Sequence, residues 1–234
     1  MSGEQMNQQA AIDPVQVIQS ERPAPARQMR RASSDEEKVQ RRDEILAAAK
    51  RVFAESGFHS TTMADVAKAA GLSYGTVYWY FDSKEALFHA LMDAEEQALR
   101  AHIGQSVIDN ALKPGDPELA VNAIRQAIRA TLEFFEDDRQ SARLLFRDSL
   151  SLGDKFEQHL FGIYERFIGD IEIAILAAQN SGRIVQGPPR MVAFSVAALI
   201  GQVALRRLVT DDGLASDVVA DFIVNLLLNG LLPR

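Results

Sequence analysis

Apolar residues recur every three or four positions over most of this chain, which is the spacing of amphipathic helices. The first such helix is predicted from residue 35 to Ser56, because Ser33-Ser34 and the acidic Asp35, Glu36 and Glu37 suit a helix start and Gly57 suits its end. Its apolar stripe comprises Ile45, Ala48, Ala49, Val52 and Phe53.

Two short helices and a longer one are predicted next. Thr61-Thr62 can start the first, and Gly71 ends it. Ser73 can cap the second, in which Val77 and Phe81 lie one turn apart and face inward. Ser83 can then cap a longer helix that runs toward His102 and links two domains. Two short helices joined by a glycine turn have helix-turn-helix geometry, which predicts a DNA-binding head.

The rest of the chain shows helical spacing without the alternation of strands. Further helices are predicted at 118–137, 139–150, 155–180, 190–209 and 214–230. The predicted fold is all-α: an N-terminal three-helix DNA-binding domain followed by a C-terminal helical domain. The predicted division is a disordered tail at 1–34, the DNA-binding domain at 35–84 and a ligand-binding and dimerisation domain at 85–234.

Composition narrows the function classes. The chain has 234 residues, 47% of them apolar, and no cysteine, so thiolate metal sites, disulfides and cysteine nucleophiles are excluded. We find no signal sequence, membrane span, HExxH pair, phosphate-binding glycine loop or recognisable catalytic triad. We therefore expect a cytoplasmic protein that is not an enzyme and needs no metal or cofactor.

Charge is distributed unevenly along the chain. The net charge is −7, but residues 27–84 carry +2, whereas residues 1–26 carry −2 and residues 85–234 carry −7. The net-positive segment thus contains the predicted head, which is compatible with DNA without proving it. Arg27, Arg30 and Arg31 form either a basic arm along DNA or part of a solvated leader.

A run of positions in the predicted head has a recognisable order: Thr62, Ala67, Ala70-Gly71, Ser73, Gly75-Thr76, Tyr78, Tyr80-Phe81, Lys84 and Leu87. Through these positions, residues 41–91 resemble the tetracycline-repressor (TetR) family of bacterial regulators. The resemblance implies a two-fold dimer, usually a repressor, with an N-terminal head that binds operator DNA and a C-terminal helical domain that binds an inducer.

The resemblance also implies roles for single residues. It assigns Thr62 and Lys84 to the phosphate backbone, and gives Tyr78 and Tyr80 phosphate or base contacts. Tyr74, Gly75 and Thr76 follow the cap Ser73 at the start of the recognition helix, where base edges are usually contacted. Packing is the alternative for the tyrosines, and it is the favoured interpretation for Trp79.

A ligand pocket is expected between the middle helices. Candidate apolar lining residues are Phe134, Leu145, Phe161, Tyr164, Phe167 and Phe194, with core packing as the alternative for each. Arg143 and Arg147 can bind an anionic head group or can be surface arginines. The expected effector is small and hydrophobic.

Dimerisation is expected through the last two helices, as in TetR-like proteins, with a monomer core as the competing account. The candidate residues are Val196, Ala197, Ile200, Gly201, Ala204, Phe222, Ile223 and Leu226. The chain is thus interpreted as a homodimeric, ligand-responsive regulator, a repressor released from a palindromic operator. The alternatives are an architectural DNA-binding protein without a small-molecule response and an enzyme in the helical domain.

Overall fold

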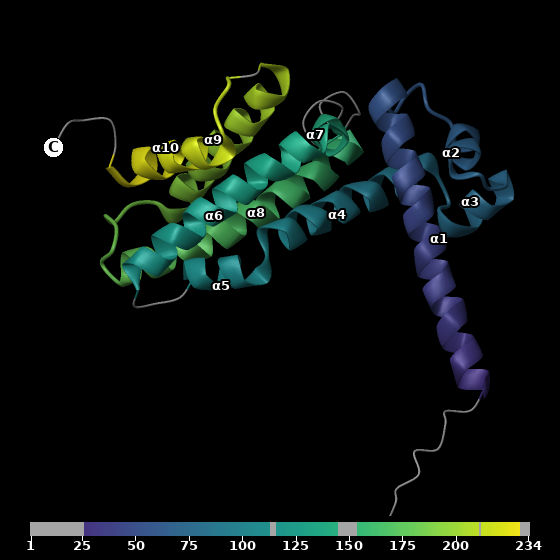
Figure 1. The fold of residues 1–234 in the computed structure, drawn as a ribbon, viewed down its shortest axis with the longest axis horizontal. Coiled ribbons are helices and arrows are strands. Elements are labelled where there is room, and N and C mark those ends of the chain that lie inside the picture. Colours follow the sequence, from purple (N-terminus) through teal and green to yellow (C-terminus); the bar gives the residue numbers. More distant parts are fainter. Residues whose placement is uncertain (1–25, 113–115, 145–153, 211, 230–234) are drawn as a thin grey trace, which may run out of the picture. The chain divides into compact units, whose positions relative to one another are not determined.

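The computed structural model describes residues 26–112, 116–144, 154–210 and 212–229, and every regular element among them is a helix (Figure 1). The helices are α1 (Ala26–Ser56), α2 (Met63–Ala70), α3 (Tyr74–Tyr80), α4 (Lys84–Ile103), α5 (Gln105–Leu112), α6 (Pro117–Asp137), α7 (Arg139–Arg143), α8 (Asp154–Asn180), α9 (Pro189–Val209) and α10 (Ser216–Asn229). The predicted all-α class is confirmed.

The chain forms two compact units, residues 1–40 and residues 41–234. In the first unit the predicted helix start is wrong, because α1 begins at Ala26 and Ser33-Ser34 lie inside it. The sequence ARQMRR before these serines is rich in good helix formers, which explains how the helix extends beyond the expected cap. The rest of the predicted tail, residues 1–25, lies outside the described residues, and a domain boundary at residue 84 stays a prediction.

The second unit contains the helices predicted beyond the head, with small shifts at their ends. One short helix, α5, was missed. It follows Gly104, whose φ of 85° ends α4 in a conformation that glycine adopts readily. The residues of the predicted 139–150 helix beyond Leu144 lie outside the described residues.

Helix α4 belongs to two hydrophobic cores. Its first half contributes Leu87, Phe88, Leu91 and Met92 to the core of α1, α2 and α3. There Phe88 lies 5.4 Å from Phe53 between ring centroids, in an edge-to-face arrangement that aromatic pairs favour. Its second half contributes Leu99 to a core built by α6, α9 and α10. We call α1 from Arg41, α2 and α3 the head, and α5 to α10 the C-terminal helices.

Among the C-terminal helices, α9 packs against α6 and α8, and α10 packs against α6 (Figure 1). Within the described residues, α9 is long and apolar enough to cross a membrane by length and composition, and 17% of that stretch is buried. The buried residues of α9 and α10 include three predicted dimer contacts, Ala197, Ala204 and Ile223. These three side chains pack in the chain's own core: Ala204 and Ile223 in the core that includes α6, and Ala197 in a cluster with Ile168 of α8.

Two histidines form a pair between α4 and α8. The rings of His89 and His159 stack at 4.4 Å between centroids with an interplanar angle of 12°. His159 Nε2 lies 3.0 Å from Asp93 Oδ1, and Arg166 lies 3.7 Å from the same carboxylate. Burial lowers the pKa of His89 from its ordinary value of 6.5, and His159 lowers it further, whereas Asp93 and Glu85 act in the opposite direction.

This lowered pKa makes stability depend on pH. Between the pKa of His89 in the folded protein and its unfolded value near 6.5, the unfolded chain binds more protons, so stability falls as pH falls. We expect the free energy of unfolding by urea to decrease from about pH 7.5 to about pH 5.5, and to decrease less in His89→Gln. The exposed His102→Gln serves as the control and should follow the wild type. Parallel curves for all three proteins would contradict this account.

Candidate nucleic-acid interface

A complete capping box starts α2. Asp65 N–H donates to Thr62 Oγ1 at 3.2 Å, and the Asp65 carboxylate accepts from Thr62 N–H at 2.9 Å and from Thr62 Oγ1 at 2.7 Å. These bonds lower the pKa of Asp65. Thr62 is exposed, as a phosphate contact requires, but its hydroxyl proton is directed to Asp65 in this structure. Its predicted DNA contact stays a prediction.

Helix α3 begins at the predicted cap. Ser73 Oγ accepts from Thr76 N–H at 3.1 Å and lies 2.7 Å from Thr76 Oγ1. Val77 and Phe81 are buried in the head core as predicted, so they fix which side of α3 faces inward. Gly71, with a φ of 68°, turns the chain between α2 and α3. The helix-turn-helix is therefore held by a cap, a glycine turn and two apolar anchors.

The outer side of α3 carries a group of exposed aromatic residues. Tyr74 and Tyr78 lie together at 4.6 Å between ring centroids, and their hydrogen bond raises the pKa of the Tyr78 phenol. Tyr80 is half-buried and packs against the head core. Trp79 is 67% exposed, so its predicted packing role is wrong. Its position two residues after the buried Val77 places it on the opposite side of the helix, a signal that the sequence contained.

Gly75 is exposed between these aromatic residues. A Cβ built on it would meet only Ser73 Oγ, at 4.0 Å, so packing within the head does not require glycine here. The space that a side chain would occupy is left open above the start of α3. Close approach of a partner to the backbone is the property that this glycine provides.

Lys84 turns back into the head. Its Nζ donates to the carbonyl oxygens of Phe58 at 2.7 Å, Thr61 at 2.8 Å and His59 at 3.5 Å. The ammonium also lies 4.3 Å from the centroid of the Phe58 ring. An ammonium has three donors, and these carbonyls use them. Lys84 thus holds the turn that leads to α2, and its predicted phosphate contact competes with these bonds.

The predicted ligand residues that the structure describes differ in their surroundings. Phe134 is buried in the core with α10, Tyr164 packs beside Ile168, and Phe167 lies 4.6 Å from the Arg100 guanidinium. Phe161 and Phe194 are 64% and 49% exposed. Leu145, Arg147 and the side chain of Arg143 lie outside the described residues, so the pocket stays a prediction.

A hollow of about 530 Å³ lies elsewhere, against α1 and α2. Its lining residues are Val52, Ser56, Ser60, Thr61, Asp65, Lys68 and Ala69, and none of the predicted ligand residues is among them. Within the residues described, no group of three histidine and acidic side chains is placed to hold a metal ion.

Comparison with known proteins gives a consistent result. The profile described as "Bacterial regulatory proteins, tetR family" matches residues 45–91. The transcriptional regulator AcrR of Shigella flexneri is 33% identical over 99 residues, 42% of this chain and 43% of that regulator, so this match spans less than half of AcrR. EthR of Mycolicibacterium smegmatis is 28% identical over 80% of this chain and 84% of its own length.

Solved structures extend the likeness to the whole fold. FadR of Bacillus subtilis, a transcriptional regulator solved in complex with stearoyl-CoA, has a TM-score of 0.69 at 20% identity, covering 81% of this chain and 98% of FadR. The fold and the exposed α3 surface define a helix-turn-helix DNA-binding protein of transcription regulation. Residues 45–91 match the tetR family of bacterial regulators, and the similarity to a named transcriptional regulator extends over 80% of the chain.

The bonds of Lys84 predict how its loss will act. Lys84→Met removes a donor from three carbonyls, of which the Phe58 carbonyl keeps the Thr61 N–H at 3.3 Å, so we expect the head to lose about 1–3 kcal/mol of stability. The slope of log affinity against log salt should stay unchanged, because no phosphate contact is removed. Lys68→Met, which alters an exposed lysine of α2, is the stability control. A slope reduced by about 0.9 in Lys84→Met would instead assign the ammonium to a phosphate.

Proposed function

We propose that this chain is a homodimeric, ligand-responsive transcriptional repressor that binds a palindromic operator in the cytoplasm and leaves it when a small hydrophobic effector binds. The observation that carries the proposal is the exposed outer side of α3, which bears tyrosines and a tryptophan on a head whose inner side is fixed by Val77 and Phe81. Large exposed aromatic residues on a short, firmly anchored helix are suited to contact a partner surface.

The DNA contacts are proposed in two groups. Tyr74, Gly75, Thr76 and Tyr78 face the base edges at the start of α3, and exposed Trp79 joins this group. The second group comprises Thr62, Ser73, Tyr80 and Lys84, which set the position of the head against phosphates or through the turn before α2. Only the first group would then change which sequences are preferred.

The dimer is proposed to form through α9 and α10. Exposed apolar residues gather on these helices: Met191, Phe194, Val209, Leu214, Val218, Phe222, Leu227 and Leu228. On α10, Val218 and Phe222 lie four residues apart and therefore on one side of the helix, and the exposed Leu214 lies just before it. An exposed apolar surface of this size on a folded chain favours a partner helix, and the same surface in a second copy satisfies two-fold symmetry.

The effector is proposed to be hydrophobic with an anionic head group. The support is the likeness of the fold to FadR, which was solved with stearoyl-CoA. Arg143 and Arg147 remain the proposed partners of the anion. The protein has one conformation that fits the operator well and another that fits it poorly. Release requires the effector to bind the second conformation more tightly, because equal affinity for both would leave their populations unchanged.

Selection of bound fragments from random DNA by the purified protein tests DNA recognition. We expect a palindromic motif, and Trp79, the only tryptophan in the chain, gives an intrinsic fluorescence signal on binding. Stearoyl-CoA at increasing concentration should weaken operator affinity by about tenfold or more, and myo-inositol hexakisphosphate, an anion without an acyl chain, is the control. Uniform coating of DNA without a motif would support the architectural alternative, and an unchanged affinity would exclude an acyl thioester effector.

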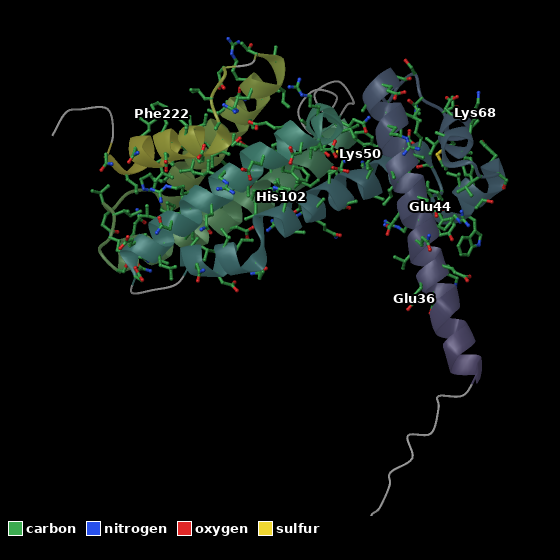
Figure 2. All side chains as sticks on the ribbon, viewed as in Figure 1. Glu36, Glu44, Lys50, Lys68, His102 and Phe222 are labelled. Carbon is green, nitrogen blue, oxygen red and sulfur yellow. The ribbon has the colours of Figure 1, made fainter. Side chains whose placement is uncertain are left out.

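Exposure of Phe222 predicts the behaviour of a charged variant at the dimer surface. Phe222, labelled in Figure 2, is 61% exposed on α10, so Phe222→Glu should leave each chain folded while placing a charge inside the proposed interface. We expect sedimentation at micromolar concentration to give a monomer. Ile173→Glu, at an exposed position on α8, is the matched control and should remain dimeric. A dimeric Phe222→Glu would contradict the proposed interface.

A further inference from the structure

A cluster of charged side chains joins the head to the C-terminal helices. Lys50 of α1, labelled in Figure 2, binds the Glu95 carboxylate of α4 at 2.9 Å and also binds the Asp138 carboxylate at the start of α7. Ser141 of α7 donates its hydroxyl to Glu95. We call these four residues the latch. Lys50, Glu95 and Ser141 come from three helices, and Asp138 lies between α6 and α7. Lys50 is the member that the head contributes.

The residues of the latch are buried or half-buried, so their charged groups need partners at specific positions. Glu95 is 5% exposed and Ser141 is fully buried. Burial alone would raise the pKa of Asp138, but hydrogen bonds from Lys50 and from the backbone of Ser141 lower it below its ordinary value. A buried ion pair adds little stability over apolar residues of the same size, whereas removing one partner leaves a charge stranded. Its distinctive property is therefore that it accepts one arrangement of its partners.

Asp138 and Ser141 couple the latch to the backbone of the C-terminal helices. The Asp138 carboxylate accepts from the N–H groups of Gln140 and Ser141, each at 3.1 Å, and thereby caps α7. The same residue ends α6. A shift at the junction of α6 and α7 must therefore move the carboxylate that holds Lys50.

Glu96, which follows Glu95, holds α4 on a second side. Glu96 accepts from Arg166 Nε of α8 at 3.0 Å and from Arg100 at 3.1 Å, and Arg100 also binds Asp170 at 2.6 Å. Successive residues of a helix point about 100° apart. Glu95 thus ties α4 to the head and α7, while Glu96 ties it to α8. Rotation of the head about α4 would therefore break the bonds between Lys50 and the rest of the latch without breaking the bonds between Glu96 and α8.

We propose that the latch of Lys50, Glu95, Asp138 and Ser141 sets the orientation of the head on α4, so that Lys50 and Glu95 determine which separation of operator half-sites the protein accepts. These residues are positioning residues that contact no base. The inference rests on the proposed function, because only a dimer with two heads discriminates between spacings. In a dimer with two heads, a fixed orientation of each head fixes the distance between the two α3 helices. That distance decides which spacing of major grooves the dimer can bind.

The first test measures head orientation without DNA. Lys50→Met combined with Glu95→Gln removes the ion pair between these two residues. The Asp138 carboxylate loses Lys50 but keeps its bonds from the N–H groups of Gln140 and Ser141. The amide introduced by Glu95→Gln still offers Ser141 a hydrogen-bond partner. The chain has no cysteine, so Lys68→Cys in the head and Glu118→Cys on α6, both exposed, give two unique spin-label sites. Labelled chains are mixed with an excess of unlabelled protein so that distances within one chain dominate. We expect a narrow distance distribution to broaden or shift in the latch variant.

The second test measures operator spacing. We expect the wild type to lose about tenfold or more in affinity when one base pair is inserted between half-sites, and the latch variant to lose about threefold or less. The wild type and the latch variant should bind an isolated half-site with affinities that agree within about twofold. Lys50→Arg, which keeps the positive charge, should discriminate between the two half-site spacings as the wild type does. Arg129→Met with Glu133→Gln, which removes an exposed ion pair within α6, is the control and should behave as wild type.

The two tests separate the two proposals. An unchanged distance distribution in the folded latch variant, or full retention of spacing discrimination, would overturn the role of the latch. Equal loss of half-site and full-site affinity would also overturn it, since the latch would then act on the integrity of the head. Failure to select any operator would count against the proposed function, and the distance measurement would still decide whether the latch orients the head.

Discussion

The structure depends on one continuous helix that belongs to two cores. The first half of α4 supplies Leu87, Phe88, Leu91 and Met92 to the head core, and its second half supplies Leu99 to the core of α6, α9 and α10. An unbroken helix transmits displacement along its axis because its backbone hydrogen bonds resist bending. Neither core can be rearranged without affecting the position of this helix.

Polar contacts then select one arrangement among those that apolar packing would allow. Hydrophobic burial is not directional, whereas buried charges require particular partners. In this chain the directional contacts gather on α4: Glu95 faces α1 and α7, Glu96 faces α8, and His89 stacks on His159. Together these contacts connect α4 both to the head, which carries the DNA-binding helix, and to the C-terminal helices.

The helices of the head and the inner side of α3 could be predicted from local sequence. Thr62 and Ser73 are the caps that the sequence indicated, and Val77 and Phe81 are buried as their spacing required. The roles that depend on distant partners could not be predicted in this way. Lys84 binds carbonyls of a turn more than twenty residues earlier, and Lys50 finds Asp138 across 88 residues, separations that no periodicity records.

Sequence by itself determined the class of the fold, the order and approximate length of most helices, and the resemblance of residues 41–91 to a family of DNA-binding regulators. These follow from interactions between residues three or four positions apart and from caps at helix ends. The tertiary structure alone decided that Ala197, Ala204 and Ile223 are core residues and that Lys50 reaches the start of α7. Which side of an apolar helix is covered depends on the neighbours that the fold brings to it, and the local pattern does not contain them.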